Sequence, residues 1–396
     1  MSRLRIAIAG AGIGGLTAAL ALAHDGHDVT VIERRTGFGE PGAGIQLSPN
    51  ASRILIALGL GAGLNRIGCE PNGIVIRAIG SGREIAEVTL GRRMRERYGA
   101  PYIVVARADL HTLLLDAVRS RGNIRLLVGR NLLEAAESKM GAEITAETGA
   151  GARETIATDL VVGADGLWSR TRAALGDTRQ PVASGFTASR AVVPTEALPR
   201  EVALDHTGLW LGPARHVVHY PIGGGRDVNI VVIERRANDR QGWSEPETGE
   251  ALLARFSRAS PALRSLLTAP ESWSAWSLHD RPLRRMAGRH IALIGDAAHP
   301  VLPYLAQGGA LAIEDAAELA VQLRRSEGNT ARALSAYAKA RTARARRVQR
   351  EARRNGRIYH LSGPAAFARN LVLGKKNPAA LADRYAWLYG WRPSDA

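Results

Sequence analysis

Cysteine is almost absent from this chain of 396 residues, which carries Cys69 alone. A single thiol excludes an intrachain disulfide framework and a zinc site built from cysteines, and it favours a reducing compartment. We therefore expect a cytoplasmic protein. Lysine is also scarce, because Lys139, Lys339, Lys375 and Lys376 are its only members among 53 basic residues. The net charge of +16 is therefore carried almost entirely by arginine.

Long apolar runs are missing as well. The apolar stretch at residues 6–22 is interrupted by glycines and lacks the small-residue cleavage pattern of a signal peptide. We expect neither a membrane span nor a secretion signal. With 45% hydrophobic and 23% charged residues, the composition is typical of a globular protein of two or three domains.

The positive charge raises the question of a nucleic-acid partner, since a basic face is the usual footprint of such binding. The arginines are spread along the whole chain, however, and the densest run lies at residues 341–357. Its spacing predicts the solvated face of a long helix. We therefore expect no nucleic-acid partner, and a basic surface that helps to attract an anionic substrate and a phosphorylated coenzyme.

Hydrophobic patterning predicts an α/β protein with an interrupted first domain. Residues 3–9, a glycine-rich turn, residues 16–24 and residues 29–33 form a strand-helix-strand unit. Residues 182–276 change to short β-type runs, which predict a mostly antiparallel inserted sheet. The remaining predicted elements are helices at 51–60, 108–119, 316–354 and 379–389, and strands at 159–162 and 289–294.

The glycine-rich turn at residues 10–15 carries the first chemical signal. Gly10 permits a tight turn, Gly12 lets the backbone approach a pyrophosphate, and Gly15 allows close packing of helix on strand. Glu33, at the end of the next strand, can accept a hydrogen bond from a ribose hydroxyl and would repel a 2′-phosphate. The turn therefore favours FAD or NAD over NADP, with a simple glycine turn as the structural alternative.

Two further segments, far along the chain, match this turn in chemistry. Residues 293–315 read as strand, acidic turn, proline-rich loop and a Gly-Gly opening onto a helix, which presents backbone amides to an electron-rich ligand such as a flavin ring. In residues 159–172, Asp165 and Gly166 form a turn, and Ser169 is placed to cap the turn that follows. His299 has no cysteine or second histidine at ligand spacing, so we expect a positional role and no metal.

Taken together, these motifs resemble the class A flavoprotein aromatic hydroxylases, the single-component FAD monooxygenases that include salicylate hydroxylase, 3-hydroxybenzoate 6-hydroxylase and 6-hydroxynicotinate 3-monooxygenase. The resemblance covers essentially the whole chain. It rests on GAGIGG at 10–15, Glu33-Arg34, GAGIQLSPNA at 42–51, Arg107 in VARADLHTLL, VVGADGLWSRTR at 161–172 and GDAAHPVLPYLAQGGALAIEDA at 295–316.

The resemblance implies a Rossmann-like FAD-binding domain of the glutathione-reductase type, an inserted, mostly antiparallel β-sheet domain for the substrate, and a helical C-terminal tail. The FAD-binding domain is expected to be discontinuous, at residues 1–75, 100–180 and 277–345. The substrate domain would comprise residues 76–99 and 181–276, and the C-terminal segment residues 346–396.

FAD is the cofactor that the resemblance implies, with NADH or NADPH as cosubstrate. The expected FAD contacts are Gly10, Gly12, Ile13, Gly14 and Gly15 in the turn, Glu33 and Arg34 at the adenosine ribose, Arg107 at the pyrophosphate or ribityl chain, and Gly295 and Asp296 at the ribityl chain. Gly44, Ile45, Gln46, Gly308 and Gly309 would hold the isoalloxazine, Pro300 would pack beside its reactive edge, and Asp165 and Gly166 would support both FAD and the transient pyridine nucleotide.

For the substrate, the resemblance points to His216 and Tyr220, which lie four residues apart on a predicted strand and therefore on one face. His216 would accept a phenolic proton and Tyr220 would hydrogen-bond the same oxygen. The alternative is that both are half-buried sheet residues with satisfied polar tips. His219 should face the other way. Gln307 resembles a glutamine that reaches the substrate.

The implied reaction is hydroxylation of a small phenolic or hydroxypyridine carboxylate, of the salicylate or hydroxybenzoate type, by NAD(P)H and O₂ through a flavin C4a-hydroperoxide. Three alternatives stay open: an FAD-dependent oxidase or dehydrogenase, a monooxygenase acting on a quinone-type or phenazine-type ring, and a basic flavoprotein regulator that binds nucleic acid. Incorporation of oxygen from O₂ separates the first alternative from hydroxylation.

Overall fold

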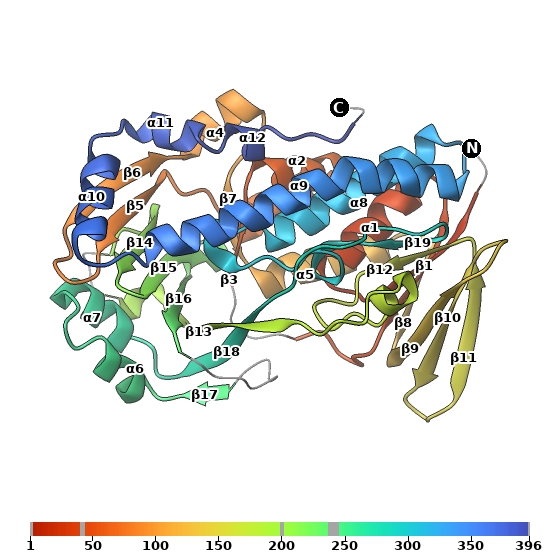
Figure 1. Cartoon of the computed structure of the whole chain (residues 1–396), viewed down its shortest axis with the longest axis horizontal. Helices are drawn as coiled ribbons and strands as arrows, with labels where there is room; N and C mark the ends of the chain where they lie inside the picture. The colour runs from red at the N-terminus through yellow and green to blue at the C-terminus, as the bar shows by residue number, and fades with distance from the viewer. Residues whose placement is uncertain (1–2, 40–43, 199–201, 237–244, 395–396) are drawn as a thin grey trace.

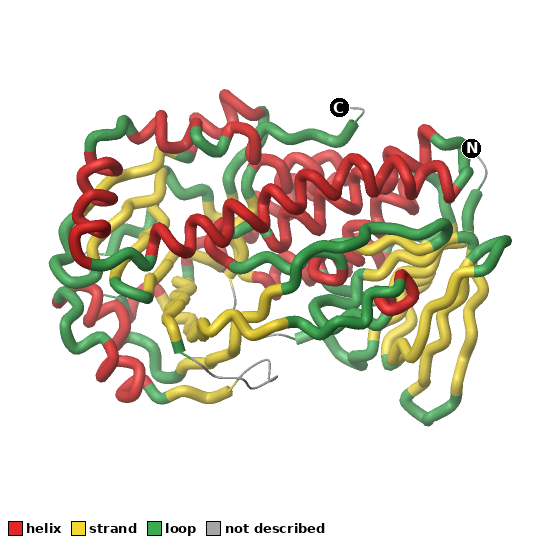
Figure 2. Tube along the Cα trace, viewed as in Figure 1, coloured by secondary structure: helices red, strands yellow, loops and turns green. Residues whose placement is uncertain are grey.

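The computed structural model describes residues 3–39, 44–198, 202–236 and 245–394. Its two largest sheets, one of five strands and one of eight, lie toward opposite ends of an elongated molecule, and the long helix α9 (Thr330–Tyr359) crosses over both (Figures 1 and 2). None of the helices in the described ranges combines the length and apolar character that a membrane crossing requires.

The five-stranded sheet is entirely parallel. Its order is β19 (Ile291–Leu293), β12 (Leu160–Gly163), β1 (Arg5–Ala9), β2 (Asp28–Glu33) and β8 (Ile124–Val128). Helices α1 (Ile13–His24), α5 (Arg107–Arg119) and α8 (Gly308–Arg325) pack together beside it. The predicted strand-turn-helix-strand unit is confirmed, with the helix beginning three residues earlier than its apolar pattern suggested.

The eight-stranded sheet contains the predicted antiparallel strands. Its order is β17 (Glu245–Glu247), β18 (Trp273–Asp280), β13 (Val182–Pro194), β16 (Asp227–Arg235), β15 (Arg215–Ile222), β14 (His206–Gly212), β5 (Gly73–Ala78) and β6 (Glu84–Thr89). Only the β14–β5 pair is parallel. Two helices that the sequence pattern did not predict, α6 (Gly249–Arg255) and α7 (Pro261–Thr268), supply core residues to one face of this sheet.

Two smaller sheets complete the β structure. Strands β9 (Arg130–Glu137), β10 (Ala142–Thr148) and β11 (Arg153–Thr158) form an antiparallel sheet that projects from one end of the molecule (Figure 1). Strands β3 (Gly44–Leu47), β7 (Ile103–Ala106) and β4 (Gly68–Cys69) form the other. Strand β15 contacts both β7 and β4, so this small sheet adjoins the eight-stranded sheet.

Three of the predicted helices are divided in the structure. The helix expected at 51–60 is α2 (Pro49–Leu55) followed by a π-helical turn, η1 (Ile56–Leu60), where Gly59 has a φ of 88°. The tail expected at 316–354 consists of α8 and α9, separated by a turn in which Glu327 and Gly328 both have positive φ. The helix expected at 379–389 consists of α11 (Pro378–Asp383) and α12 (Ala386–Tyr389). The remaining helices are α3 (Gly61–Ile67), α4 (Gly91–Tyr98) and α10 (Gly363–Gly374).

The arginine run on α9 is only partly solvated. Arg341 is fully buried and forms ion pairs with Asp315 at 2.7 Å and Glu314 at 2.8 Å. Arg344 also pairs with Glu314, and Arg353 pairs with Asp280. The prediction of a solvated face is therefore wrong for these three arginines, which anchor α9. The arginines at 346, 347, 350, 354 and 357 are exposed, as predicted.

Candidate active site

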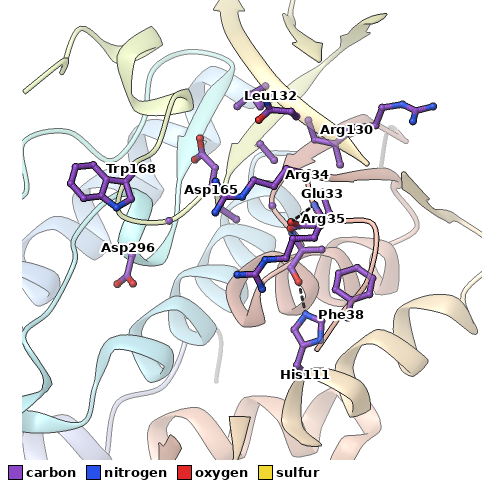
Figure 3. Close-up of a pocket in the computed structure, with 18 of the residues that line it drawn as sticks. Glu33, Arg34, Arg35, Phe38, His111, Arg130, Leu132, Asp165, Trp168 and Asp296 are labelled. Atoms are coloured by element: carbon purple, nitrogen blue, oxygen red, sulfur yellow. Dashed lines mark hydrogen bonds between the residues drawn. The ribbon is translucent and has the colours of Figure 1, made fainter. Parts of the chain in front are cut away.

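A cleft of about 280 Å³ opens at the carboxyl ends of β1, β2 and β12, where the parallel sheet meets α5. It brings together eight of the predicted cofactor-binding residues: Gly10, Gly12, Glu33, Arg34, Arg107, Asp165, Gly166 and Asp296. Figure 3 shows Asp296 and Trp168 on one side of this cleft and Phe38 and His111 on the other. Segments separated by more than 250 residues therefore line one cavity.

The glycines of the turn differ in what surrounds them. Gly10 has a φ of 105°, which disfavours any residue with a Cβ. A Cβ on Gly15 would collide with the carbonyl oxygen of Gly10, and a Cβ on Gly14 would lie 2.9 Å from Ala312 of α8. A Cβ on Gly12 would meet nothing within 4 Å. Gly12 alone of these residues thus leaves open space beside the backbone, as a bound pyrophosphate requires.

Glu33 ends β2 beside this turn. Its carboxylate accepts hydrogen bonds from the backbone N–H of Ala11 at 2.9 Å and from that of Arg35 at 3.0 Å. A nitrogen of the His111 ring lies 2.7 Å from the carbonyl oxygen of Ala11, and the ring contacts Phe38. These contacts fix the carboxylate at the cleft wall, where it can accept from a ribose.

Asp165 lines the cleft, and its carboxylate also holds the turn that follows β12. Its carboxylate accepts from the hydroxyl groups of Ser169 and Thr171 and from the backbone N–H of Arg170 and Thr171. Ser169 in turn accepts from the N–H of Arg172, which confirms the predicted cap. The side chain therefore holds the turn, while Gly166, with a φ of 76°, lines the cleft.

Asp296 follows β19 and reaches the cleft from the far end of the chain. Its side chain is accessible from the cavity. Desolvation by the surrounding protein raises the pKa of its carboxyl above the ordinary value, although the charges of His299 and Arg107 act to lower it. The preceding residue, Gly295, has a φ of 56° and donates its N–H to Asp315 at 2.9 Å. Backbone conformation therefore sets the direction of Asp296.

His299 is buried, and its Nε2 lies 2.6 Å from the Asp315 carboxylate. Burial alone would raise the pKa of Asp315, but His299 and Arg341 outweigh it and hold this pKa at about 2. The positional role predicted for His299 agrees with this contact. No group of acidic, histidine or cysteine side chains suited to a metal ion occurs among the described residues.

The residues predicted to hold a flavin ring lie next to one another. The Ile45 side chain of β3 occupies the space where a Cβ on Gly309 would stand, so β3 packs closely on the start of α8. Gly308 has open space beside it. Residues 42 and 43 of the same motif lie outside the described residues. With the open turn at Gly12 and the acid at Glu33, the residues present fit FAD, since its phosphates, ribose and ring each find a matching element.

Tyr220 packs directly on β3. Its ring occupies the position that a Cβ on Gly44 would fill, and burial raises the pKa of its hydroxyl, which therefore stays protonated. Tyr102 donates a hydrogen bond of 2.5 Å to the side chain of Gln46, also on β3. The structure thus places Tyr220 beside two of the residues predicted to hold the flavin ring.

His216 lies on the same face of β15, but among aromatic rings. Its Nδ1 is 2.9 Å from Nε2 of His360, and its ring contacts those of Tyr304 and Tyr359. Burial lowers the pKa of His216 well below its usual value, and His360 lowers it further, so the ring is neutral at pH 7. His219 lines a separate cavity with Trp210, and thus faces the other way, as predicted.

Gln307 and Pro300 belong to the loop that precedes α8. The amide of Gln307 donates to Ser48 at 2.9 Å and accepts from Asn50 at 3.1 Å, so both of its polar groups have protein partners. Pro300 is buried, and its carbonyl accepts from Gln349 of α9 at 2.8 Å. In this arrangement Gln307 connects the loop to α2, and a direct substrate contact stays a prediction.

Three residues near these sites were not identified from the sequence. Tyr304 lies within the motif at 295–316, which marked it only as part of a proline-rich loop. Arg172 lies within the motif at 161–172 and donates to the carbonyl oxygens of Ala297 and Asp296. His360, at the end of α9, carries no local signal at all, because only the packing of α9 on β15 brings it to His216.

Known proteins are similar to this chain over most of its length. Residues 3–352 match the family model described as FAD binding domain. The chain is 38% identical over 392 residues to 3-hydroxybenzoate 6-hydroxylase 1 of Aquipseudomonas alcaligenes, covering 97% of each chain. It is 38% identical to 3-amino-4-hydroxybenzoate 2-monooxygenase PtnB3 of Streptomyces platensis, covering 98% of this chain and 96% of the relative.

A solved structure gives the same result for the fold. The structure of Klebsiella pneumoniae HpxO complexed with FAD and uric acid superposes with a TM-score of 0.84 at 26% identity, covering 98% of this chain and 96% of that one. The similarity therefore extends over both large sheets and the C-terminal helices.

Proposed function

This chain belongs to the FAD-binding-domain family whose members include the flavoprotein aromatic hydroxylases, and from that premise we propose that it uses NADH or NADPH and O₂ to hydroxylate a small phenolic carboxylate of the hydroxybenzoate type. The observation that carries the proposal is that Tyr220 of β15 packs on Gly44 of β3, beside residues predicted to hold the flavin ring, in a chain whose nucleotide cleft is open at Gly12. Two relatives that match nearly the whole chain are named as hydroxybenzoate hydroxylating enzymes.

FAD, when bound, supplies hydride acceptance from the pyridine nucleotide and activation of O₂. The side chains and backbone of the protein would hold FAD in position. Glu33 and Asp296 would accept hydrogen bonds from hydroxyl groups at two places along the dinucleotide, and Arg107 lines the same cleft. Gly12 admits the pyrophosphate, because it leaves the backbone amides uncovered.

On the substrate side, β15 would present two polar tips. Tyr220 stays protonated and can donate a hydrogen bond to a phenolic oxygen, while the neutral imidazole of His216 can accept the phenolic proton. A phenolate pushes electron density into the ring and activates it toward an electrophilic oxygen. Tyr304, Tyr359 and His360 enclose His216 in rings, which keep bulk water from the base.

A phenolic carboxylate is favoured over a quinone-type or phenazine-type ring for two reasons. The aligned relatives bear hydroxybenzoate names, and a base beside a tyrosine is suited to an ionisable phenol. The single cysteine favours a cytoplasmic location.

The test is oxygen incorporation by the FAD-loaded protein. With ¹⁸O₂, NADH or NADPH and 3-hydroxybenzoate as the first of a panel of hydroxybenzoates, the product should gain one ¹⁸O atom, and the other atom should leave as water. Consumption of the pyridine nucleotide with an oxidised product that carries no ¹⁸O would establish an oxidase or dehydrogenase instead.

The substrate-side assignment is tested by His216→Asn and Tyr220→Phe, with His24→Asn and Tyr98→Phe as matched controls. His24 is exposed at the end of α1, and the Tyr98 hydroxyl has no hydrogen-bond partner in the part of the chain that the structure describes. We expect His216→Asn to lower kcat by about 100-fold, the usual contribution of a positioned base. Unchanged affinity and turnover in both site variants would remove these residues from the site.

A further inference from the structure

A second cavity, of about 460 Å³, lies between the eight-stranded sheet and α7. Arg77 of β5, Trp210 of β14 and His219 of β15 line its sheet side, and Pro261, Ala262, Ser265 and Leu266 line its helix side. It shares no lining residue with the nucleotide cleft. We call it the sheet cavity.

Strand register brings the sheet-side residues together. Trp210 is paired with Arg77 on one side, and Gly208, two residues earlier on the same face, is paired with His219 on the other. His216 and Tyr220 belong to the opposite face of β15. The sheet itself therefore separates the sheet cavity from the residues assigned to the substrate.

Two buried polar groups in this cavity have no partner. Trp210 is 5% exposed and His219 is 4% exposed, and neither the indole Nε1 nor the imidazole Nε2 has a hydrogen-bond partner among the described residues. An unpaired buried polar group costs about 1–3 kcal/mol. Both nitrogen atoms are inaccessible to solvent, so they lie within the cavity wall and the rings present their flat surfaces to the cavity.

The shape of the cavity depends on Gly208. A Cβ at this position would collide with the imidazole of His219, so glycine allows that ring to lie flat over β14. The indole of Trp210 and the imidazole of His219 lie with their centroids 6.3 Å apart. Together with Leu266 and Pro261 they give the cavity flat, apolar walls that match a planar ring.

Among the described residues that line the cavity, Arg77 is the only Lys, Arg, Asp or Glu. Its guanidinium lies 5.5 Å from the centroid of the Trp210 ring, and the carboxylate of the half-exposed Glu84 is 4.0 Å away. Burial and the charge of Arg77 lower the pKa of His219 to about 4, so the imidazole is neutral at pH 7. His206, at the rim, is 2.8 Å from the Asp205 carboxylate. A guanidinium requires a hydrogen-bond acceptor, and an anionic one is favoured.

We propose that the sheet cavity binds a monocyclic aromatic carboxylate, with the ring against Trp210 and His219 and the carboxylate toward Arg77. The volume falls in the range of small-molecule sites, about 300–1,000 Å³. The site is separate from the cleft and does not depend on the proposed reaction, so a protein that failed to hydroxylate any ring would still be expected to bind here.

Calorimetric titration of the FAD-loaded protein with benzoate tests the proposal, with flavin absorbance recorded in parallel. We expect one binding event that leaves the flavin spectrum unchanged. That event should be at least about tenfold weaker with cyclohexanecarboxylate, which lacks the flat ring, and with benzamide, which lacks the charge. A tenfold loss corresponds to about 1.4 kcal/mol.

Two variants place that event in the sheet cavity. Arg77→Gln removes the guanidinium but keeps a polar side chain, and Ala262→Leu adds bulk at an exposed position of α7 without disturbing the core. Both should weaken the flavin-silent event by about tenfold or more, while the response of the flavin spectrum to hydroxybenzoates stays unchanged. The proposal is overturned if neither variant alters that event, if all three probes bind equally, or if benzoate binds only with a change in the flavin spectrum.

Discussion

Gly12 and Gly15 are both glycines of the nucleotide turn, yet they are needed for different physical reasons. Gly15 packs so closely that a Cβ would overlap the carbonyl oxygen of Gly10, whereas Gly12 has open space beside it. One glycine is required by the folded protein and the other by what the cleft binds.

Substitution by alanine should separate these requirements. Gly15→Ala forces helix α1 away from β1, and we expect it to lower the free energy of unfolding by about 1–3 kcal/mol, as overpacking does. Gly12→Ala should leave the unfolding free energy of the FAD-free protein within about 0.5 kcal/mol and weaken FAD binding by about tenfold, because the methyl group occupies the pyrophosphate space. Denaturant unfolding and flavin fluorescence titration measure the two effects. Equal losses of stability in both variants would contradict this division.

His216 and His360 share a single contact between ring nitrogens. Burial lowers the pKa of both histidines, that of His360 to about 4, so at pH 7 one neutral ring donates to the other. A base must be neutral to accept a proton, so activity is lost as pH falls through the pKa of His216. His360 is thus a positioning residue that sets the tautomer of His216 and keeps its pKa low.

Replacing His360 by Phe should move the acidic limb of the kcat–pH profile to higher pH. The stacking of this position on Phe186 is kept, but the His360 ring no longer lowers the pKa of His216. We expect kcat at pH 7 to fall by about tenfold with little change in KM, because the substrate contacts are retained. An unshifted profile with a lower kcat would indicate a packing role only.

Sequence reasoning succeeded at residues whose role is set locally. The glycine spacing identified the tight turn and the open position, because both follow from backbone geometry over a few residues. It did not identify His360, whose partner is 144 residues away, or the protein partners of the Gln307 and Asp165 side chains. Those contacts depend on which segments the fold brings together.

Helices α8 and α9 are joined by buried charges. Arg341, Glu314, Asp315 and Arg344 form a compact ion-pair cluster, and the guanidinium of Arg341 also lies over the ring of Trp391 at 4.7 Å. Periodicity predicted a helix here but did not distinguish the buried arginines from the exposed ones. An arginine that anchors the helix through an ion pair and one that is solvated give the same sequence pattern. The break between α8 and α9 and the π-helical turn were missed for a related reason, since each depends on one or two residues with positive φ.

Arg341→Met should destabilise the protein by about 3–5 kcal/mol, because it removes one cationic partner from each of two buried carboxylates. Arg350→Met, on the exposed side of the same helix, is the matched control and should change stability by about 0.5 kcal/mol or less. Urea unfolding at pH 7 compares them. Similar midpoints for the two variants would mean that the run is a solvated face after all.

The same cluster makes stability depend on pH in a definite direction. The pKa of Asp315 is about 2 in the folded protein, below the value of about 3.9 for an unfolded chain. The carboxylate therefore stabilises the fold above pH 4, and this contribution disappears as pH falls from about 4 to 2. In Arg341→Met the pKa of Asp315 should rise, so the loss should begin at higher pH.

Across the whole molecule, the cleft is built from segments at residues 9–12, 32–35, 107–112, 164–170 and 296. No local sequence pattern predicts that these segments meet. Parallel strands bring their carboxyl ends to one edge, which accounts for the convergence of β1, β2 and β12. The insertion of the eight-stranded sheet was predictable from the change to β-type runs at residues 182–276 and from the return of a buried-strand pattern at 289–294.

The net charge of +16 is a property of the whole molecule that should affect association with anions. A positive surface attracts an anionic substrate at long range, and salt screens this attraction, with a Debye length of about 10 Å at 0.1 M. At saturating pyridine nucleotide, kcat/KM for a hydroxybenzoate should therefore fall by about three- to tenfold as ionic strength rises from about 0.02 M to about 0.3 M. A neutral dihydroxybenzene, turned over at the same site, should show little change because it carries no charge for the surface to attract. Equal salt dependence for the acid and the neutral phenol would show instead that salt acts on the protein or on the cofactor, and that the arginine-rich surface has no part in substrate capture.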